Sequence, residues 1–294
     1  ATSPAAPCGG TTAIGPPNVG TTSTGPVTYT VTYGGATSIC LSDSDMTLFY
    51  RTGSATGTIA VTGTGTTTRT VTISGITGDG TLGITIAACT ASDDAGYTAR
   101  GAGPSATFTV DNSGPTISIG PPIETTTSGG PVDYIVTYTG ATSISLAVGD
   151  ITLNNPTGTA NGTVSVLNNG PTTRTVRISG ITGDGTLGIT IAAGTASDDA
   201  GNTAPGAGPS ATFTVDNTAP TILISGPTPT STSTGPVTYT VTYGGATSIS
   251  LSDTDITLNN PTGSATGTIA VTGTGTTTRT VTISGITGDG TLGS

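Results

Sequence analysis

The chain has 294 residues, of which 7% are charged, against roughly 25% in an average globular protein. It contains no His and no Lys, which excludes Ser-His-Asp and Cys-His catalysis, imidazole metal ligands and a lysine Schiff base. The net charge of −10, with only six Arg, argues against a surface that binds nucleic acid. We therefore expect a protein that is not an enzyme.

A long internal repeat organises the sequence. The segment Thr24–Ile39 is identical to Thr234–Ile249, and Gly53–Gly83 is identical to Gly263–Gly293. Gly-Pro-Val begins at positions 25, 130 and 235, a period of 105 residues. Solenoid units run about 20–50 residues, whereas one β-sandwich domain has about 100. The prediction is a Pro- and Gly-rich tail over residues 1–13, repeat 1 over 14–115, repeat 2 over 116–220 and an incomplete repeat 3 over 221–294.

Within repeat 1, apolar residues alternate with Thr and Ser. Every second residue from Val27 to Tyr33 is Val or Tyr, which places these side chains on one face of a strand. The same alternation predicts strands around Ile39–Leu41, Ile59–Val61, Val71–Ile73, Leu82–Ala88 and Ala106–Val110. One apolar face per strand is typical of antiparallel sheets that pack face to face. The sequence predicts an all-β fold, and no run approaches the roughly 20 apolar residues of a membrane-spanning helix.

A shared motif closes repeats 1 and 2. Thr-Ala-Ser-Asp-Asp-Ala-Gly begins at Thr90 and at Thr195, and Phe-Thr-Val-Asp-Asn follows at Phe108 and at Phe213. Thr-Ala-Pro-Thr-Ile comes directly after the second copy. This combination resembles the bacterial Ig-like (BIg-type) repeats of large surface adhesins, whose copies end in an Asp-x-Ala-Gly-Asn segment and a Val-Asp-x-Thr-Ala-Pro linker. Repeat 1 departs from the pattern, with Tyr97 in place of Asn.

The resemblance implies tandem immunoglobulin-like β-sandwich domains in an extended array. It also implies a secreted bacterial surface protein, located outside the cell, whose repeats form a stalk or fibre. Partners would then be neighbouring copies of the chain itself, or a host, surface or glycan target. A glycan- or ligand-binding module is one alternative function, and Tyr50 and Tyr97 are its only aromatic candidates outside the apolar faces.

Acidic residues recur in register near the predicted ends of the repeats. Oxygen-rich loops of this kind suit Ca²⁺, which takes six to eight oxygen ligands. In the resembled family, Ca²⁺ at domain borders stiffens the array. The alternative is that Asp and Asn only form turns by bonding to nearby backbone. The candidate calcium ligands are Asp93, Asp94, Asp111, Asp198, Asp199, Asn202 and Asp216, with Asp150 and Asp255 in a second recurrent loop.

Three cysteines occur, all of them in the first 89 residues. Cys40 and Cys89 stand where the other repeats have Ser or Gly, and both fall in the outward register of their strands. We expect a surface disulfide between them, which fits an oxidising, extracellular setting. Cys8 is then unpaired or bonds to another molecule.

Repeat 3 lacks the counterparts of two core strands, Ile84–Ala88 and Ala106–Val110. An incomplete sandwich exposes an apolar groove and strand edges that invite pairing. Two explanations stay open: the chain is a fragment of a longer array, or a neighbouring subunit supplies the strands. The second explanation makes the chain a subunit of a homopolymeric extracellular filament assembled by strand complementation.

Overall fold

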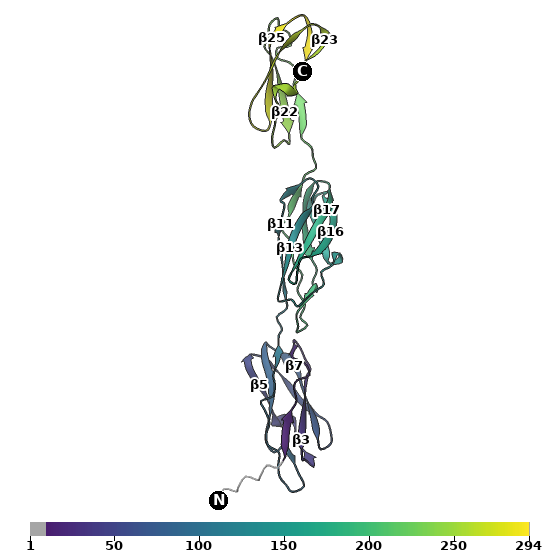
Figure 1. The fold of residues 1–294 in the computed structure, drawn as a ribbon, viewed down its shortest axis with the longest axis vertical. Coiled ribbons are helices and arrows are strands. Elements are labelled where there is room, and N and C mark those ends of the chain that lie inside the picture. The colour runs from purple at the N-terminus through teal and green to yellow at the C-terminus, as the bar shows by residue number, and fades with distance from the viewer. Residues whose placement is uncertain (1–9, 294) are drawn as a thin grey trace. The chain divides into compact units, whose positions relative to one another are not determined.

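The computed structural model describes residues 10–293, with Tyr50 described by its backbone only. Strands dominate every part of it, as the arrows in Figure 1 show. The helical segments in this range are three 3-10 turns, η1 (Asp43–Asp45), η2 (Val148–Asp150) and η3 (Asp253–Asp255). None of the described helices has the length and apolar character to span a bilayer. The chain divides into two compact units, Ala1–Val215 and Asp216–Ser294, so the first unit holds repeat 1 and repeat 2 as far as Val215, and the second holds repeat 3 with the five residues before it.

Repeat 1 is a sandwich of two four-stranded sheets. One sheet has the strand order β1-β3-β7-β6 and the other the order β2-β10-β8-β5, while β4 and β9 form a separate two-stranded ribbon. The ten strands are β1 (Thr11–Ile14), β2 (Thr21–Thr22), β3 (Val27–Gly34), β4 (Ser38–Ile39), β5 (Met46–Gly53), β6 (Thr56–Thr62), β7 (Thr68–Thr77), β8 (Gly80–Ile86), β9 (Ala91–Ser92) and β10 (Phe108–Val110).

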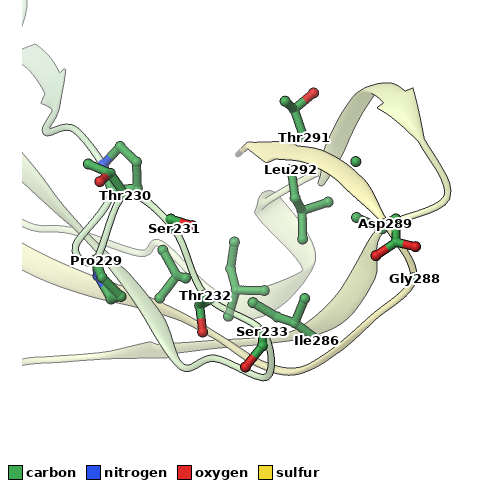
Figure 2. A pocket seen from close by; sticks show the side chains of 15 residues that line it. Pro229, Thr230, Ser231, Thr232, Ser233, Ile286, Gly288, Asp289, Thr291 and Leu292 are labelled. Carbon is green, nitrogen blue, oxygen red and sulfur yellow. The ribbon is translucent and has the colours of Figure 1, made fainter.

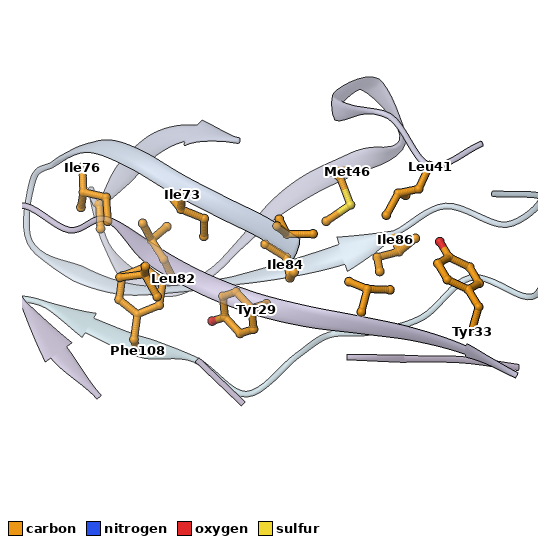
Figure 3. Packing of buried hydrophobic residues seen from close by; sticks show 14 of the residues in the cluster. Tyr29, Tyr33, Leu41, Met46, Ile73, Ile76, Leu82, Ile84, Ile86 and Phe108 are labelled. Carbon is orange, nitrogen blue, oxygen red and sulfur yellow. The ribbon is translucent and has the colours of Figure 1, made fainter. Parts of the chain in front are cut away.

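The predicted alternation along β3 is confirmed. Val27, Tyr29 and Val31 are completely buried and Tyr33 is 3% exposed, whereas the Thr residues between them are half-buried or exposed. Figure 3 shows the Tyr29 side chain among those of Leu82 and Ile84 of β8 and Phe108 of β10. Each fully buried Val, Leu, Ile or Phe side chain contributes about 1.5–3 kcal/mol, so the core is the main source of stability.

The chain enters repeat 1 at one end and leaves it at the other. The first residue of β1, Thr11, pairs with Gly34 at the end of β3. The last residue of β10, Val110, pairs with Gly80 and with Thr22, which lies shortly before the start of β3. Because β3 runs the length of the sandwich between these points, entry and exit lie about 25 Å or more apart at roughly 3.3 Å per residue.

Repeat 2 has the same architecture. Its sheets have the orders β11-β13-β17-β16 and β12-β20-β18-β15, with β14 and β19 as the separate ribbon. Its strands are β11 (Thr116–Pro122), β12 (Thr126–Thr127), β13 (Val132–Thr139), β14 (Ser143–Ile144), β15 (Ile151–Gly158), β16 (Asn161–Asn168), β17 (Thr173–Thr182), β18 (Gly185–Ile191), β19 (Ala196–Ser197) and β20 (Phe213–Val215).

Repeat 3 has one complete sheet and a two-stranded remainder of the other. The sheet order β21-β22-β25-β24 matches the first sheet of the other repeats, and β23 pairs with β26. Its cluster of buried apolar residues holds five members, against seventeen in repeat 1, because one wall of the sandwich is incomplete. The strands are β21 (Thr221–Ile224), β22 (Val237–Gly244), β23 (Asn259–Gly263), β24 (Thr266–Thr272), β25 (Thr278–Thr287) and β26 (Gly290–Gly293).

The all-β, tandem β-sandwich prediction is therefore confirmed. One boundary differs from the sequence prediction. The proposed tail over residues 1–13 overlaps β1, which begins at Thr11 and pairs with β3 along its whole length. The sequence Thr-Thr-Ala-Ile has only one large apolar residue, so period-2 alternation cannot reveal this edge strand.

Candidate functional site

Each 3-10 turn ends in an Asp, namely Asp45, Asp150 or Asp255, and the side chain of this Asp closes the turn. Asp45 Oδ2 accepts hydrogen bonds from the Ser42 amide at 2.9 Å and the Ser42 hydroxyl at 2.6 Å. Asp255 makes the same pair of bonds to Ser252 at 2.8 and 2.7 Å, and Asp150 Oδ2 accepts from the Ala147 amide at 2.8 Å. The bonds from the serines lower the pKa values of Asp45 and Asp255, because they stabilise the charged carboxylate.

The Asp-Asp-Ala-Gly loop is a turn held by its first Asp. Asp198 Oδ1 accepts the amides of Ala200 and Asn202, both at 2.9 Å, and Oδ2 accepts the Asn202 side-chain amide at 3.0 Å. Partial burial opposes ionisation, but these bonds keep the pKa of Asp198 below its usual value. In repeat 1, Asp93 Oδ1 accepts the amides of Ala95 and Tyr97 at 3.0 and 2.9 Å.

The second Asp of each Asp-Asp pair, Asp94 or Asp199, does not hold the turn. No hydrogen bond or ion pair involves the carboxylate of Asp94 or Asp199 within residues 10–293. Asp111 Oδ1 accepts the Ser113 amide at 2.9 Å, and Asp216 Oδ1 accepts the Thr218 amide at 3.0 Å, which are short Asx turns in the linkers. Across the described residues, no three Asp, Glu or Cys side chains gather into a metal site.

Asn202 links repeat 2 to the segment that precedes it. Its side-chain amide donates to the Asp111 carbonyl oxygen at 2.7 Å. This bond uses the side-chain NH2 group of Asn202, whereas a calcium ligand would be its Oδ1, so the bond neither supplies nor blocks a calcium ligand. Repeat 1 has Tyr97 at the corresponding position, so it cannot make the same bond. Calcium binding at these loops stays a prediction.

Cys40 and Cys89 are exposed and free in the structure. The Cys40 Sγ lies 3.6 Å from the Cys89 carbonyl oxygen, and the Cys89 Sγ lies 3.4 Å from the Thr98 hydroxyl. Cys89 has φ of 69°, a left-handed conformation that the corresponding Gly194 adopts at φ of 83°. The expected disulfide is thus not formed here, although the two residues are neighbours. Cys8 lies outside the described residues.

The two aromatic candidates for ligand binding do not form a described patch. Tyr97 is 40% exposed, and its backbone amide is part of the Asp93 turn. The side chain of Tyr50 lies outside the description of the structure. Nearby, the Arg51 guanidinium lies 5.9 Å from the centre of the Phe49 ring, on the strand that carries Tyr50.

Repeat 3 contains a groove beside its last strand. Its volume is about 340 Å³, and it lies between the segment Pro229–Ser233 and strand β26. Figure 2 shows Leu292 and Ile286 turned toward this space, with Asp289 and Thr291 along one wall and the Thr230–Ser233 segment along the other. The sequence predicts an apolar groove in this repeat. Only the structure shows which residues form its walls and that its rim is polar.

In repeats 1 and 2 the corresponding space is filled by a strand. Phe108 of β10 pairs with Leu82 and packs its ring 6.4 Å from that of Tyr29, and Phe213 and Tyr134 repeat this arrangement at 6.4 Å. The Tyr29 hydroxyl donates to the Ala106 carbonyl oxygen at 2.8 Å. Sequence reasoning identified these aromatic residues as core but could not place them against each other.

No protein-family model matches the chain, and no curated protein matches it. Among solved structures, it is similar to FdeC, described as a novel broadly conserved Escherichia coli adhesin eliciting protection against urinary tract infections. The identity is 16% and the TM-score 0.37, over 94% of this chain and 88% of that chain. A likeness of this degree carries no argument about the function of this chain.

Proposed function

We propose that the chain is a non-enzymatic extracellular surface protein whose repeats form a stalk or fibre that carries mechanical tension, for adhesion or for cell-surface structure. The observation that supports it is the parallel pairing of the second strand of each complete repeat with its last strand. β2 and β10 run parallel, as do β12 and β20 in repeat 2.

Tension along the chain loads this parallel pair in shear. β2 is pulled toward the N-terminus and β10 toward the C-terminus, and in a parallel pair these two directions are opposite along the strand axis. The Thr109 amide donates to the Gly20 carbonyl oxygen at 2.9 Å, and the Asp111 amide donates to that of Thr22 at 3.1 Å. These bonds must break together rather than one after another, which suits a domain that resists stretching.

We call the paired strands β2/β10 and β12/β20 the clamp. The last strand of each clamp also contributes side chains to the hydrophobic core. Phe108 and Val110 are each 1% exposed, so sliding β10 along β2 exposes two large apolar side chains. In repeat 2 the Thr214 amide donates to the Thr125 carbonyl oxygen at 2.9 Å, and Phe213 and Val215 are buried to the same extent. Both complete repeats therefore contain the clamp, with the same buried side chains behind it.

Single-molecule force spectroscopy on the variant Thr109→Pro tests this proposal. Proline removes the amide that bonds Gly20, so the unfolding force of repeat 1 should fall while that of repeat 2 stays unchanged. Thr66→Pro, in an exposed bend of the same repeat, is the matched control and should leave both forces unchanged. Equal effects of the two substitutions would contradict the proposal.

A second candidate function follows from the groove of repeat 3. A sandwich that leaves a strand-shaped space can be completed by a strand from another chain, which would make this chain a subunit of a homopolymeric filament. Electron microscopy of the purified protein at high concentration tests this candidate. Filaments support it, and short separate particles at every concentration would count against it.

A further inference from the structure

Repeat 1 holds the first two residues of the linker that leads into repeat 2. This linker, residues 111–115, joins β10 to β11. The Asp111 amide donates to the Thr22 carbonyl oxygen at 3.1 Å, so the linker starts at the clamp. The Asn112 amide donates to Asp79 Oδ1 at 2.7 Å, and its side-chain amide donates to the carbonyl oxygen of the preceding glycine at 2.6 Å. The linker is therefore bound to repeat 1 through both its backbone and a side chain.

Repeat 2 holds the same linker through Asn202. The side-chain NH2 group of an Asn has two hydrogens and can donate to two acceptors. In Asn202 its nitrogen lies 3.0 Å from Asp198 Oδ2, within the turn, and 2.7 Å from the Asp111 carbonyl oxygen, 91 positions earlier in the chain. The bond to Asp198 orients the NH2 group toward the linker. Asp111 is thus bonded to repeat 1 through its amide and to repeat 2 through its carbonyl oxygen.

The turn that carries Asn202 forms equally well without an Asn side chain. In repeat 1, Tyr97 stands at this position, and Asp93 Oδ1 accepts the same two backbone amides, at 3.0 and 2.9 Å. The corresponding bonds to Asp198 in repeat 2 are both 2.9 Å long. The Asn side chain is therefore not needed to shape the loop. What it adds is the bond to the linker, together with the bond that orients its NH2 group.

Gly114 allows the linker to approach repeat 2 closely. A Cβ atom at this position would lie 2.9 Å from the Thr203 carbonyl oxygen and 3.6 Å from the Asn202 Cβ atom. The shorter of these distances is below what real Cβ atoms show, so any larger residue must push the linker away from the loop. Pro115, the next residue, is buried and has a fixed φ. The end of the linker is therefore held close to repeat 2.

We propose that Asn202 and Gly114 lock the joint between repeats 1 and 2, so that the two repeats move as one rigid body without a bound metal ion. Relative motion is the ordinary behaviour of two domains joined by a short linker with a small contact between them. The lock goes beyond the proposed function, because it concerns the bending of the stalk, whereas the clamp concerns resistance to unfolding. The two proposals can therefore fail separately.

Pulsed electron spin resonance on the whole chain measures the motion of the joint. Spin labels are attached at Thr30→Cys and Thr137→Cys, which are exposed positions on β3 and β13. The background carries Cys8→Ser, Cys40→Ser and Cys89→Gly, and the last two changes introduce the residues that repeat 2 has at these positions. We expect a narrow distribution of label-to-label distances in EDTA, since the lock needs no metal ion. A broad distribution in EDTA would overturn the proposal, whether or not Ca²⁺ narrows it.

Three variants in this labelled chain locate the lock. Asn202→Ala removes the donor to the linker and should broaden the distance distribution at least about twofold, because the linker then lets the repeats move. Gly114→Ala forces the linker away from Thr203 and should broaden it as well. Tyr97→Ala changes the same loop position in repeat 1, and as the matched control should leave the distribution unchanged. Equal distributions for Asn202→Ala and Tyr97→Ala would contradict the lock.

Hydrogen exchange and force spectroscopy separate a loose joint from a damaged repeat. In Asn202→Ala, amide exchange in β13 and β18 should stay as slow as in the unchanged chain, because Asp198 Oδ1 still accepts two backbone amides in the turn. The unfolding forces of repeats 1 and 2 should also stay unchanged, since both clamps are intact. Faster exchange in these strands would mean that Asn202 stabilises repeat 2 rather than the joint, and would contradict the proposal.

Discussion

At the scale of single residues, the carboxylates are mostly used inside turns. Asp45, Asp93 and Asp198 each accept two or more hydrogen bonds from atoms at most four positions away in the sequence. The sequence shows that these Asp recur, but duplication copies turn residues and ligands alike. The number and spacing of these Asp residues could be predicted. The hydrogen-bond partners of each carboxylate could not, because they depend on the local backbone geometry of the loop, which the alternation of apolar and polar residues does not encode.

Calcium binding stays a proposal, centred on the exposed Asp94 and Asp199 and their neighbours. It predicts that millimolar Ca²⁺ raises the melting temperature above that in EDTA, because a ligand bound only by the folded state stabilises that state. The turn interpretation, which the hydrogen bonds support, predicts equal melting temperatures. Differential scanning calorimetry in both solutions decides between them, with Mg²⁺ as the control for ionic strength.

The pH dependence of stability follows from the lowered carboxylate pKa values. The Arg177 guanidinium bonds Asp133 at 2.8 Å and lowers its pKa, as Ser42 and Ser252 lower those of Asp45 and Asp255. A carboxyl whose pKa is lower in the folded state adds stability above its unfolded pKa and loses it as the pH falls through the folded value.

The chain has no His, so we expect the free energy of unfolding to change little between pH 5 and pH 8. At pH values below about 4, where the carboxylates become protonated, the free energy of unfolding should decrease. Urea unfolding at a series of pH values measures this. The variant Asp133→Asn should show a shallower acid decline. A marked step between pH 5 and 8 would contradict the assignment.

The Cys40–Cys89 disulfide stays a prediction, and the left-handed backbone at Cys89 makes it testable. A non-Gly residue there costs of order 1–3 kcal/mol, which a covalent bond can offset. We expect a non-reducing peptide map to contain the linked pair. Reduction should then lower the stability of repeat 1 by about 3–4 kcal/mol, since the bond closes a loop of roughly 50 residues. Repeat 2, with Ser145 and Gly194 at these positions, is the internal control.

At the scale of elements, alternation predicts the long strands and misses the short ones. β3, β7 and β8 each present buried residues at every second position over part of their length, which makes them visible in the sequence. β2 consists of two Thr residues and is half-buried, so nothing in its composition marks it. Yet β2 forms the parallel side of the clamp. The element most important for the proposed function could be found only from strand pairing.

The strand β20 gives a prediction for stability. Phe213 is 1% exposed and packs against Tyr134, so Phe213→Ala should destabilise repeat 2 by about 3–5 kcal/mol. Thr214→Ala, next to it on the exposed face of the same strand, should change stability by less than about 0.5 kcal/mol. Denaturant unfolding of both variants provides the measurement. Comparable losses would mean that β20 does not seal the core.

At the scale of the whole molecule, the 105-residue period predicts three similar domains, and the structure shows two complete sandwiches and one open one. The groove in repeat 3 could be predicted because the sequence contains only two copies of Phe-Thr-Val, at Phe108 and Phe213, and neither belongs to this repeat. What could not be predicted is which residues form the walls of this groove. That depends on Pro229–Ser233 lying opposite β26, which are about 60 residues apart in the sequence.

If the complete repeats resist tension through the clamp, they should be mechanically stronger than repeat 3, which lacks this strand pair among the described residues. Pulling single molecules by their two ends tests it directly. Unfolding a complete repeat of about 105 residues should lengthen the chain by about 35 nm, and repeat 3 by about 25 nm, at up to 3.6 Å per residue. We expect two long steps at high force and one shorter step at clearly lower force. Long steps at forces equal to or below that of the short step would contradict it.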